Sequence, residues 1–576
     1  MRQIIRGGIL GDMVSQQIKK DLGKVLQKLK INPSKLVLEH PADPQHGDYA
    51  TNIAMRCWRS GYHSPFDLAA KIINTWRSEG LPSWVAKIEV VKPGFINLWL
   101  EKEFLISQTE EVIKKKYQLK RMAKEKKRVM VEFAHPNTHK QFHIGHLRNI
   151  CLGEAICRLL EANDQPVYRI NYQGDVGLHV AKCLWGLLKL KKPTPRSLAK
   201  KIELLAKAYV KGNKAYETEE KARAEIDTLN LKIYTQDKEI MSLWKETRSW
   251  SLQYFDQIYQ RLATKFDRLY FESQVAGEGK KIVLSNLKKK IFQESEGAVI
   301  FPGEKYGLHN RVFLNQKGLP TYEAKDMALA KKQFEDYSPL KILHVVGPEQ
   351  KGYFEVVFKA LGQVYPKTAD KEFHLIYGWV RLKNGKMSSR TGDVILGEWL
   401  LEEVKKRLTK QFKMTEQITE KVAVSAVKYS MLRFSPQSEI VFDIGESINL
   451  EGDSGPYLQY TYARSHSVLE KSGLDLKKIE FSFPHLHPKT EEQTLLRTIY
   501  KFLEVVQQAG EKFAPNLICS FLFDLAQKYN VFYNKFSILK ADSAQLVNFR
   551  LFLTLAVSQV LKNGLQLLGI EAPDRM

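Results

Sequence analysis

Cysteine is scarce in this chain, and its spacing excludes two common architectures. The 576 residues contain five cysteines, and no two of them form a Cys-x-x-Cys pair. An odd and scattered set of this kind predicts neither a disulfide framework nor a cysteine-rich zinc site, so we expect no zinc. Free thiols suit a reducing compartment. The scarcity of cysteine therefore predicts a cytoplasmic protein.

Long apolar runs are also missing. The opening stretch MRQIIRGGILGDMV has no apolar core of the signal-peptide type. No uninterrupted apolar stretch reaches the ~18 residues that a membrane helix needs. These absences predict a soluble chain that does not act at a membrane.

Acidic residues are outnumbered by basic ones. The chain has 64 Asp and Glu against 89 Lys and Arg, which leaves a formal net charge of +25. Its hydrophobic share of 44% is ordinary for a globular protein and excludes a wholly disordered or fibrous chain. At roughly 150 residues per domain, the length predicts about three to five domains. The positive excess favours a polyanion such as nucleic acid as partner, although it can also serve solubility alone.

The hydrophobic pattern predicts a mixed α+β unit followed by an α/β domain. Residues 1–112 combine a helical pattern at Met13 to Leu29 with strand-like alternation in KIEVVKPGFINLWL, and 113–128 form a basic linker. Residues 129–400 begin with a strand, a helix from about His146 and a second strand. This βαβ unit predicts a Rossmann-type parallel sheet.

A helical insertion and further helices complete the predicted organisation. The insertion covers about 185–270, and the second half of the sheet follows in GAVIFP, RVFLN, KILHVVG and EFHLIYGWVRL. Residues 401–449 form a helical connecting region, and 450–576 form an all-α domain. In one of its helices the spacing predicts a single apolar face. That face consists of Leu495, Ile499, Phe502 and Val506.

Two histidines flank a glycine at the start of the helix in the βαβ unit. His143 and His146 stand three residues apart with Gly145 between them. In the first turn of a helix this spacing puts both imidazoles on one side, and the glycine lets a ligand approach the backbone. The positive end of the helix favours an anion such as a triphosphate. Alone, the motif is weak, because a pair of histidines is more often structural.

A second motif follows the last strand of the predicted sheet. Lys386 supplies a point charge for a phosphate, and Ser388 and Ser389 supply hydroxyl donors. A short Lys/Ser loop is usually only a solvated turn. Ligands of open α/β sheets, however, bind at the carboxyl ends of the strands, where both motifs would meet. Together the two motifs predict a nucleotide site.

The two motifs resemble the His-Ile-Gly-His and Lys-Met-Ser-Lys-Ser signatures of the class I aminoacyl-tRNA synthetases. Within that class, the chain is similar to the arginyl-tRNA synthetases nearly from end to end. The blocks that carry this resemblance are HGDYATNIAM, KPGFINLWL, VEFAHPNTHKQFHIGHLRN, NYQGDVG, TYEAKDMALA, EGDSGPYLQYTYAR and LLGIEAPDRM. The second signature departs from the family pattern, since Arg390 follows two serines and Thr391 and Asp393 stand where the family more often has Lys-Gly-Asn. Lys386 is retained.

This resemblance implies an enzyme that activates L-arginine with ATP and transfers it to the terminal ribose of tRNA(Arg), with release of AMP and pyrophosphate. ATP would be accompanied by Mg²⁺, held mostly by phosphates and water. The residues implied to be catalytic are Lys140, His143, Gly145, His146 and Lys386. Those implied to bind ATP are His143, His146, Lys386, Ser388 and Ser389.

An arginine pocket needs fixed carboxylates, because the guanidinium is planar and always charged. Glu132 and Asp326 are the candidates. The resemblance places Glu132, Asn137, Tyr322, Asp326 and Gln350 around the amino acid. Tyr322 and Asp326 stand one helical turn apart and can face one cavity, although the same spacing also suits a solvated Lys-rich helix. Lysine cannot match the guanidinium fork, so we expect direct selection without an editing domain.

The tRNA contacts are implied by resemblance alone. The family uses its N-terminal unit as an additional tRNA-binding domain and its last domain to bind the anticodon. The residues implied to contact tRNA are Phe95, Asn97, Tyr457, Tyr460 and Arg464. For any single tyrosine, packing competes with base stacking. The resemblance also implies a monomer.

Three alternatives remain at this point. A nucleotidyltransferase of the same superfamily shares the His-x-Gly-His motif, but such chains are short. Another synthetase would need a zinc site, an editing insertion or basic residues in the amino-acid pocket. A catalytically inactive RNA-binding paralogue would not need His143, His146 and Lys386.

Overall fold

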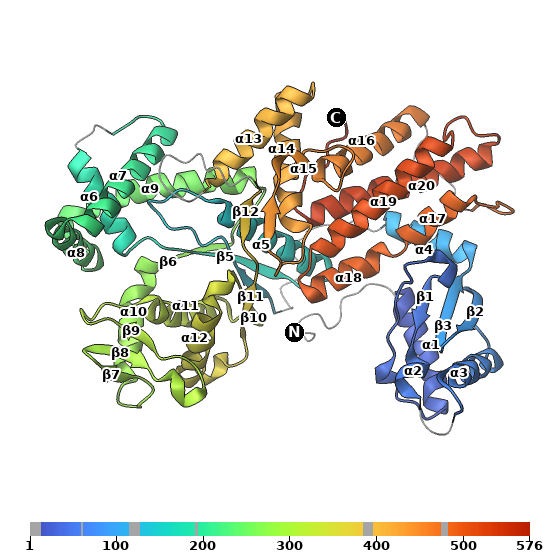
Figure 1. The fold of residues 1–576 in the computed structure, drawn as a ribbon, viewed down its shortest axis with the longest axis horizontal. Helices are drawn as coiled ribbons and strands as arrows, with labels where there is room; N and C mark the ends of the chain where they lie inside the picture. The colour runs from blue at the N-terminus through green and yellow to red at the C-terminus, as the bar shows by residue number, and fades with distance from the viewer. Residues whose placement is uncertain (1–12, 59–61, 115–126, 191–193, 384–394, 474–481) are drawn as a thin grey trace.

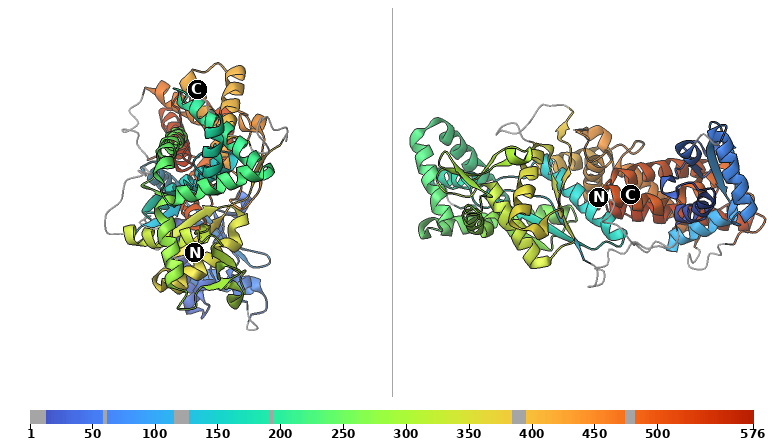
Figure 2. Two further views of the ribbon diagram at one scale, coloured as in Figure 1. Left: turned by 90° about the vertical axis from the view of Figure 1, so that its left-hand side faces the viewer. Right: turned by 90° about the horizontal axis from the view of Figure 1, so that it is seen from below.

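The computed structural model describes residues 13–58, 62–114, 127–190, 194–383, 395–473 and 482–576. Its parts are spread along one long axis (Figures 1 and 2). The helical insertion lies at one end, the N-terminal unit lies at the other, and the parallel sheet and the C-terminal helices lie between them.

The N-terminal unit packs helices against a three-stranded antiparallel sheet with the order β1-β3-β2. Its elements are α1 (Val14–Lys28), β1 (Tyr49–Thr51), α2 (Ile53–Cys57), α3 (Pro65–Glu79), β2 (Val85–Val91), β3 (Phe95–Leu100) and α4 (Lys102–Lys114). The helix predicted from Met13 to Leu29 is confirmed, because these two residues are the caps of α1. The pattern KIEVVKPGFINLWL forms two strands joined by a turn.

A five-stranded parallel sheet forms the centre of the molecule and confirms the predicted Rossmann-type fold. Its order is β11-β10-β4-β5-β6. The strands are β4 (Val129–Glu132), β5 (Val167–Gln173), β6 (Arg268–Phe271), β10 (Lys341–Val346) and β11 (Glu372–Ile376). The strand order reverses between β4 and β10, which is the switch point where ligands of open α/β sheets bind. Glu132 and Val346 end these two strands.

Helices cover the sheet, and a second small sheet lies beside it. The helices are α5 (Ile144–Ala162), α10 (Glu272–Ser285), α11 (Tyr322–Tyr337) and α12 (Lys351–Val364). The small antiparallel sheet consists of β7 (Gln293–Ser295), β8 (Ala298–Phe301) and β9 (Arg311–Leu314). The patterns GAVIFP and RVFLN were expected in the main sheet and instead form β8 and β9. The connection between β8 and β9 is too short for the crossover that parallel pairing requires.

The insertion is fully helical, as predicted, but begins earlier than residue 185. Its helices are α6 (Leu178–Leu190), α7 (Leu198–Thr218), α8 (Glu220–Tyr234) and α9 (Lys238–Arg261). It has a small core of its own that includes Val180, Ile226 and Trp244. The C-terminal half of α9 returns to the main core, where Phe255 and Tyr259 are buried.

After β11, the described part of the chain is helical apart from a two-stranded parallel ladder of β12 and β13. Its elements are β12 (Val380–Leu382), α13 (Gly397–Gln411), α14 (Glu416–Leu432), β13 (Ile440–Phe442), α15 (Ile444–Ser447), α16 (Gly455–Ser472), α17 (Thr490–Ile499), α18 (Phe502–Lys512), α19 (Asn516–Lys535) and α20 (Ala544–Leu567). The apolar face predicted from Leu495 to Val506 is buried, but it spans two helices, because α17 ends before Tyr500. By length and composition α20 could cross a membrane. It packs against α16, α17, α19 and α4, as the core helix of a helical domain does.

Candidate active site

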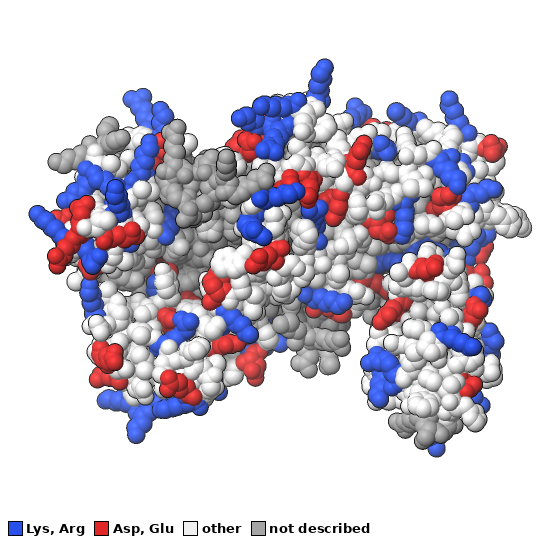
Figure 3. Space-filling view, in the orientation of Figure 1, with Lys and Arg blue, Asp and Glu red and all other residues white. Residues whose placement is uncertain are grey.

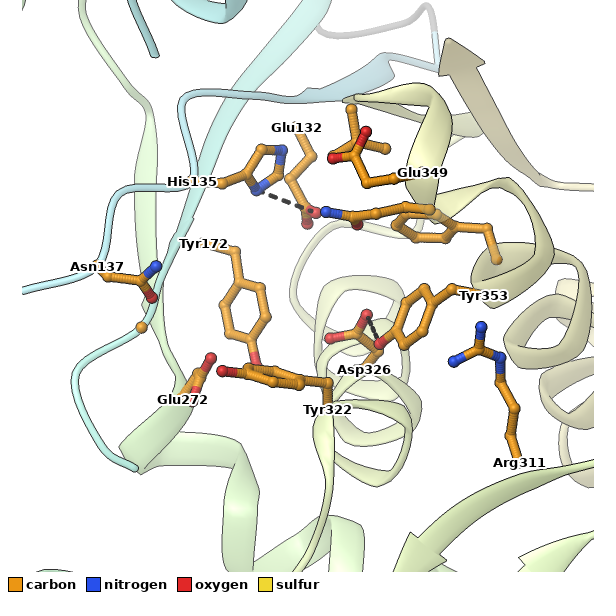
Figure 4. A pocket seen from close by; sticks show the side chains of 14 residues that line it. Glu132, His135, Asn137, Tyr172, Glu272, Arg311, Tyr322, Asp326, Glu349 and Tyr353 are labelled. Carbon is orange, nitrogen blue, oxygen red and sulfur yellow. Dashed lines mark hydrogen bonds and ion pairs between the residues drawn. The ribbon is translucent and has the colours of Figure 1, made fainter. Parts of the chain in front are cut away.

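A cavity of about 470 Å³ opens at the switch point of the parallel sheet (Figure 4). It is lined from the ends of β4, β5 and β10 and from α10, α11 and α12. All five residues that the sequence comparison assigned to arginine line this one cavity, although they are scattered over more than 200 positions. They are Glu132, Asn137, Tyr322, Asp326 and Gln350.

Asp326 is a carboxylate of this cavity for which the described residues show no cationic partner. It stands one turn after Tyr322 on α11, so both side chains reach the cavity, as their spacing predicted. Its Oδ2 accepts a hydrogen bond of 2.6 Å from the hydroxyl of Tyr353. Burial raises the pKa of Asp326 to about 7, and the Tyr353 hydrogen bond opposes that rise. A carboxylate of this kind gains most from a cationic ligand.

Glu132 is ionised, and both of its carboxylate oxygens already have partners within the protein. His344 Nδ1 lies 3.0 Å from its Oε1, and Gln333 Nε2 donates to its Oε2 at 2.5 Å. His344 also lies 2.6 Å from Glu372 through its Nε2. Burial lowers the pKa of His344, but the two carboxylates outweigh it and raise the pKa to about 10. His344 is therefore an imidazolium that neutralises much of the Glu132 charge.

Further residues line the cavity that the sequence did not indicate. Tyr353 is one of them, and its ring stacks against the guanidinium of Arg311 at 5.3 Å. Arg311 in turn pairs with Glu323 at 3.1 Å. Glu272 lines the cavity and forms a buried ion pair with Lys325. Of these additional residues, Glu349 had a visible signal, as a polar residue three positions after a buried strand.

His143 and His146 cap the first turn of α5 rather than lining this cavity. The helix begins at Ile144, with His143 as its N-cap, two residues before the predicted start. Gly145 N–H donates to Nδ1 of His143, and His143 N–H donates to Nδ1 of His146, each at 3.1 Å. Because both Nδ1 atoms accept, each neutral ring carries its proton on Nε2.

Both rings are neutral at pH 7. Burial, with Lys140 nearby, lowers the pKa of His143 to about 4. Burial and the neighbouring His143 hold the pKa of His146 well below its usual range. Each histidine therefore offers an Nε2–H donor to an oxygen ligand, beside the free N–H groups of a helix N-terminus.

The loop between β4 and α5 is held in an unusual conformation. Ala134, His135 and His139 have φ values of 81°, 47° and 64°. His139 Nε2 lies 2.8 Å from Oγ1 of Thr247 on α9, and its N–H donates to Oγ of Ser251. The insertion thus supports this loop.

Two predicted site regions can be compared with the structure only in part. Lys140 lies in the supported loop, with its ammonium 4.7 Å from the ring centre of Tyr209 on α7. Lys386, Ser388 and Ser389 lie outside the described residues. Among the residues that the structure describes, no group of three His, Cys, Asp or Glu side chains is arranged to hold a metal ion.

The residues expected to contact tRNA differ in accessibility. Asn97 is 3% exposed and Tyr457 is also buried, whereas Phe95 is half-buried and Tyr460 is 38% exposed. Arg464 lies between the rings of Tyr460 and Tyr533, at 4.8 and 5.0 Å from their centres.

Tyr460, Arg464 and Tyr533 line a second cavity, of about 700 Å³, which also includes Lys471 and Arg575. Aromatic faces beside cationic side chains suit single-stranded bases. Buried Asn97 and Tyr457 are better placed for packing than for direct contact.

Three family models match consecutive parts of the chain. The model of the catalytic domain of class I (R) tRNA synthetases matches residues 108–444, which is more than half of the chain. The chain belongs to the arginyl-tRNA synthetase family. The model of the arginyl-tRNA synthetase N-terminal domain matches residues 14–100, and the DALR anticodon-binding domain model matches 458–576.

Individual relatives agree with this family. The arginine–tRNA ligase of Parabacteroides distasonis is 33% identical over 85% of this chain and 88% of its own length. That of Bdellovibrio bacteriovorus is 35% identical over 78% of this chain and 80% of its own length. The solved structure of Thermus thermophilus arginyl-tRNA synthetase shares the fold, with a TM-score of 0.80 at 24% identity over 98% of this chain and all of that one.

Proposed function

We propose that this arginyl-tRNA synthetase receives the guanidinium of arginine at Asp326. The observation that carries this assignment is a half-buried carboxylate in the cavity whose partner among the described residues is the neutral hydroxyl of Tyr353, and whose pKa burial raises to about 7. The family's reaction is the ATP-dependent attachment of arginine to tRNA. In this pocket Asp326 would form the charged contact, and Glu132, already paired with His344, would add acceptor capacity and negative potential.

Tyr322, Asn137 and Gln350 would complete the arginine subsite. Tyr322 is 57% exposed at the mouth of the cavity, where its ring would cover the aliphatic part of the substrate. Asn137 and Gln350 approach from the loops after β4 and β10, the side on which the α-amino and carboxylate groups would lie. These side chains orient the carboxylate so that it can attack the α-phosphorus of ATP.

The nucleotide would be held at the start of α5. The Nε2–H groups of His143 and His146 and the first N–H groups of the helix are donors for phosphate and ribose oxygens. Lys140 and Lys386 would supply positive charge as pyrophosphate leaves, and Ser388 and Ser389 would add hydroxyl donors. Mg²⁺ would accompany ATP and be held mostly by phosphates and water.

The remaining parts would bind tRNA(Arg). We assign residues 1–112 as an additional tRNA-binding domain, 113–128 as a linker, 129–400 as the catalytic domain, 401–449 as a connecting region and 450–576 as the anticodon-binding domain. Basic side chains, with acidic ones between them, occur along the whole length of the described surface in Figure 3, and the net positive charge supports contacts along an extended polyanion. We propose a cytoplasmic monomer, with Tyr460 and Arg464 as the best-exposed candidates for base contacts.

The first test is aminoacylation of bulk tRNA with each of the twenty amino acids. We expect charging with arginine alone, because only a guanidinium offers a planar, charged set of donors to the carboxylates of this cavity. Charging with another amino acid would overturn the assignment.

Lys386→Ala should reduce turnover by about two orders of magnitude or more, since it removes a charge that stabilises the leaving pyrophosphate.

The second test addresses Asp326 itself. Asp326→Asn keeps the shape of the side chain but removes its charge, so the KM for arginine should rise by about 100-fold or more. The matched control is Glu335→Gln, which removes an exposed charge from the same helix. If both variants had the same KM for arginine, Asp326 would not be the guanidinium contact.

A further inference from the structure

Arg148 is an unusual side chain for the interior of an enzyme. It lies on α5, one turn after the two capping histidines, and it is 1% exposed. Among the residues that the structure describes, it is the largest fully buried side chain. No carboxylate pairs with it within that part of the chain, and its guanidinium instead donates to three backbone carbonyls. A buried charge with this arrangement calls for a specific role.

The three carbonyls belong to one short stretch of chain between α14 and β13. Nη1 donates to the carbonyl of Met431 at 3.0 Å, in the last turn of α14. Nη2 donates to the carbonyls of Pro436 at 2.8 Å and Ser438 at 3.0 Å. The end of a helix carries partial negative charge, so the guanidinium also stabilises α14 electrostatically. One side chain therefore holds α5 against the segment 431–438.

The same segment is also bound by the chain that follows β11, the edge strand of the parallel sheet. Gly378 N–H donates to the carbonyl of Pro436 at 2.8 Å. A Cβ atom at Gly378 would lie 2.4 Å from the carbonyl oxygen of Ser438, so only glycine fits this contact. The segment continues into β13, which pairs with β12. Arg148 and Gly378 thus fix the position of the β12–β13 ladder.

The chain on both sides of residues 384–394 is anchored to α5. After that segment, Ile144 N–H donates to the carbonyl of Ile395, and Gly397 N–H donates to that of Phe142, each at 2.9 Å. Before it, Lys383 N–H donates to the carbonyl of Phe442, at the end of β13. Residues 395–397 therefore contact the start of α5 directly through the backbone. Lys383 contacts β13, and β13 is connected to α5 through the segment 431–438 that Arg148 binds.

We propose that Arg148 is a positioning residue for the ATP-dependent step. The contacts of its guanidinium with residues 431–438 hold the β12–β13 ladder at a fixed distance from the first turn of α5, which carries His143 and His146. This proposal rests on the proposed function, since it assigns ATP to that turn. Asp326, the proposed arginine contact, lies on α11, and none of the three carbonyls that Arg148 binds belongs to a residue that lines the arginine cavity.

The chemistry explains why the side chain is an arginine. A guanidinium presents several donors in a rigid plane, so it can bind carbonyls from two directions at once. A lysine ammonium also has three donors, but all of them lie on one nitrogen, so it cannot occupy the two separate positions from which Nη1 and Nη2 reach their carbonyls. Burial lowers the pKa of Arg148 to about 10, which still leaves it charged at neutral pH.

The test compares Arg148→Lys with Arg148→Met in full aminoacylation, with separate KM values for ATP, arginine and tRNA. We expect kcat to fall at least about tenfold for Lys and further for Met, with the KM for arginine within about twofold of wild type. Gly378→Ala places a methyl group against the carbonyl of Ser438 in the same segment. This variant should also lower kcat while the KM for arginine stays within about twofold of wild type. Wild-type charging of tRNA with arginine tests the proposed function separately.

The matched control is Arg158→Lys. Arg158 lies on the same helix and also donates to carbonyls, those of Gln566 on α20 and Ala263 just after α9, and it pairs with Glu154 one turn earlier. We expect this control to lower the melting temperature while kcat stays within about twofold. A kcat for Arg148→Lys no lower than that of the control would overturn the proposal. A rise in the KM for arginine that matches the fall in kcat would also overturn it, because it would indicate general loss of the site.

Discussion

At the scale of the residue, the protonation of Asp326 should govern arginine binding. Burial raises the pKa of Asp326 to about 7 in the empty pocket, and a bound guanidinium must lower it. Arginine affinity is therefore fully present above that pKa and is lost as the pH falls. We expect the KM for arginine to rise by up to about tenfold per pH unit below pH 7, measured from roughly pH 8 to 5.5 at constant ionic strength.

Tyr353→Phe supplies the control for this pH dependence. The variant removes the hydroxyl that donates to Asp326 and lowers its pKa. The pKa of the carboxyl should then be higher, so the loss of arginine affinity should begin at a higher pH than in the wild type. A KM that is independent of pH in both proteins would show that Asp326 does not titrate on arginine binding.

Single residues also show what sequence reasoning can and cannot reach. Tyr322 and Asp326 were predictable because helical spacing puts residues four apart on one face. The engagement of Glu132 was not predictable. Its partners His344 and Gln333 come from β10 and α11, about 200 positions away, and only the fold brings them together. The family resemblance therefore identified the two carboxylates, but neither it nor the local pattern could predict which of them already has a charged partner.

At the scale of the element, helix α9 of the insertion should support the nucleotide loop. Thr247→Val removes the hydroxyl 2.8 Å from Nε2 of His139 and leaves that buried ring nitrogen unpaired. We expect a loss of about 1–3 kcal/mol in the free energy of unfolding. The KM for ATP should also rise several-fold, since this loop leads to Lys140 and His143. Thermal unfolding and steady-state kinetics measure both effects.

Thr228→Val is the matched control for this prediction. Thr228 lies on α8 of the same insertion, and its hydroxyl donates only to the carbonyl of Ala224, one turn earlier. The control should leave the KM for ATP unchanged. If Thr247→Val also left it unchanged, the insertion would not support the ATP site.

Elements with strong periodicity were predictable, and their assembly was less so. The βαβ unit and the helical insertion follow from apolar spacing alone. The placement of β8 and β9 does not, because an apolar run predicts a strand without saying which strand it pairs with. Likewise the spacing from Leu495 to Val506 looked continuous, although the chain turns at Tyr500 between α17 and α18. Pairing partners and turns depend on contacts that a local pattern does not contain.

At the scale of the whole molecule, Glu504 on α18 should hold the N-terminal unit in place. Its carboxylate accepts from Ser15 N–H at 3.0 Å and from the Tyr49 hydroxyl at 2.8 Å, and it lies 3.2 Å from Nε2 of His40. All three partners belong to the N-terminal unit, which lies beneath α17 and α18 in Figure 1. One side chain thus joins residues more than 450 positions apart.

Glu504→Gln tests this junction with little change in volume. An amide has only one acceptor oxygen, and its NH₂ group would face a donor, so docking should weaken by about 2–3 kcal/mol. Hydrogen exchange should then increase in α1 and α18, and the KM for tRNA should rise while those for ATP and arginine stay the same. Glu511→Gln is the control, because Glu511 is a half-buried carboxylate on the same helix that accepts a hydrogen bond from Gln507 within that helix. Equal rises in all three KM values would mean that the N-terminal unit stabilises the whole enzyme, and unchanged exchange would mean that other contacts hold it. Only a rise confined to tRNA, with local exchange, fits a unit that docks through Glu504 and serves tRNA binding.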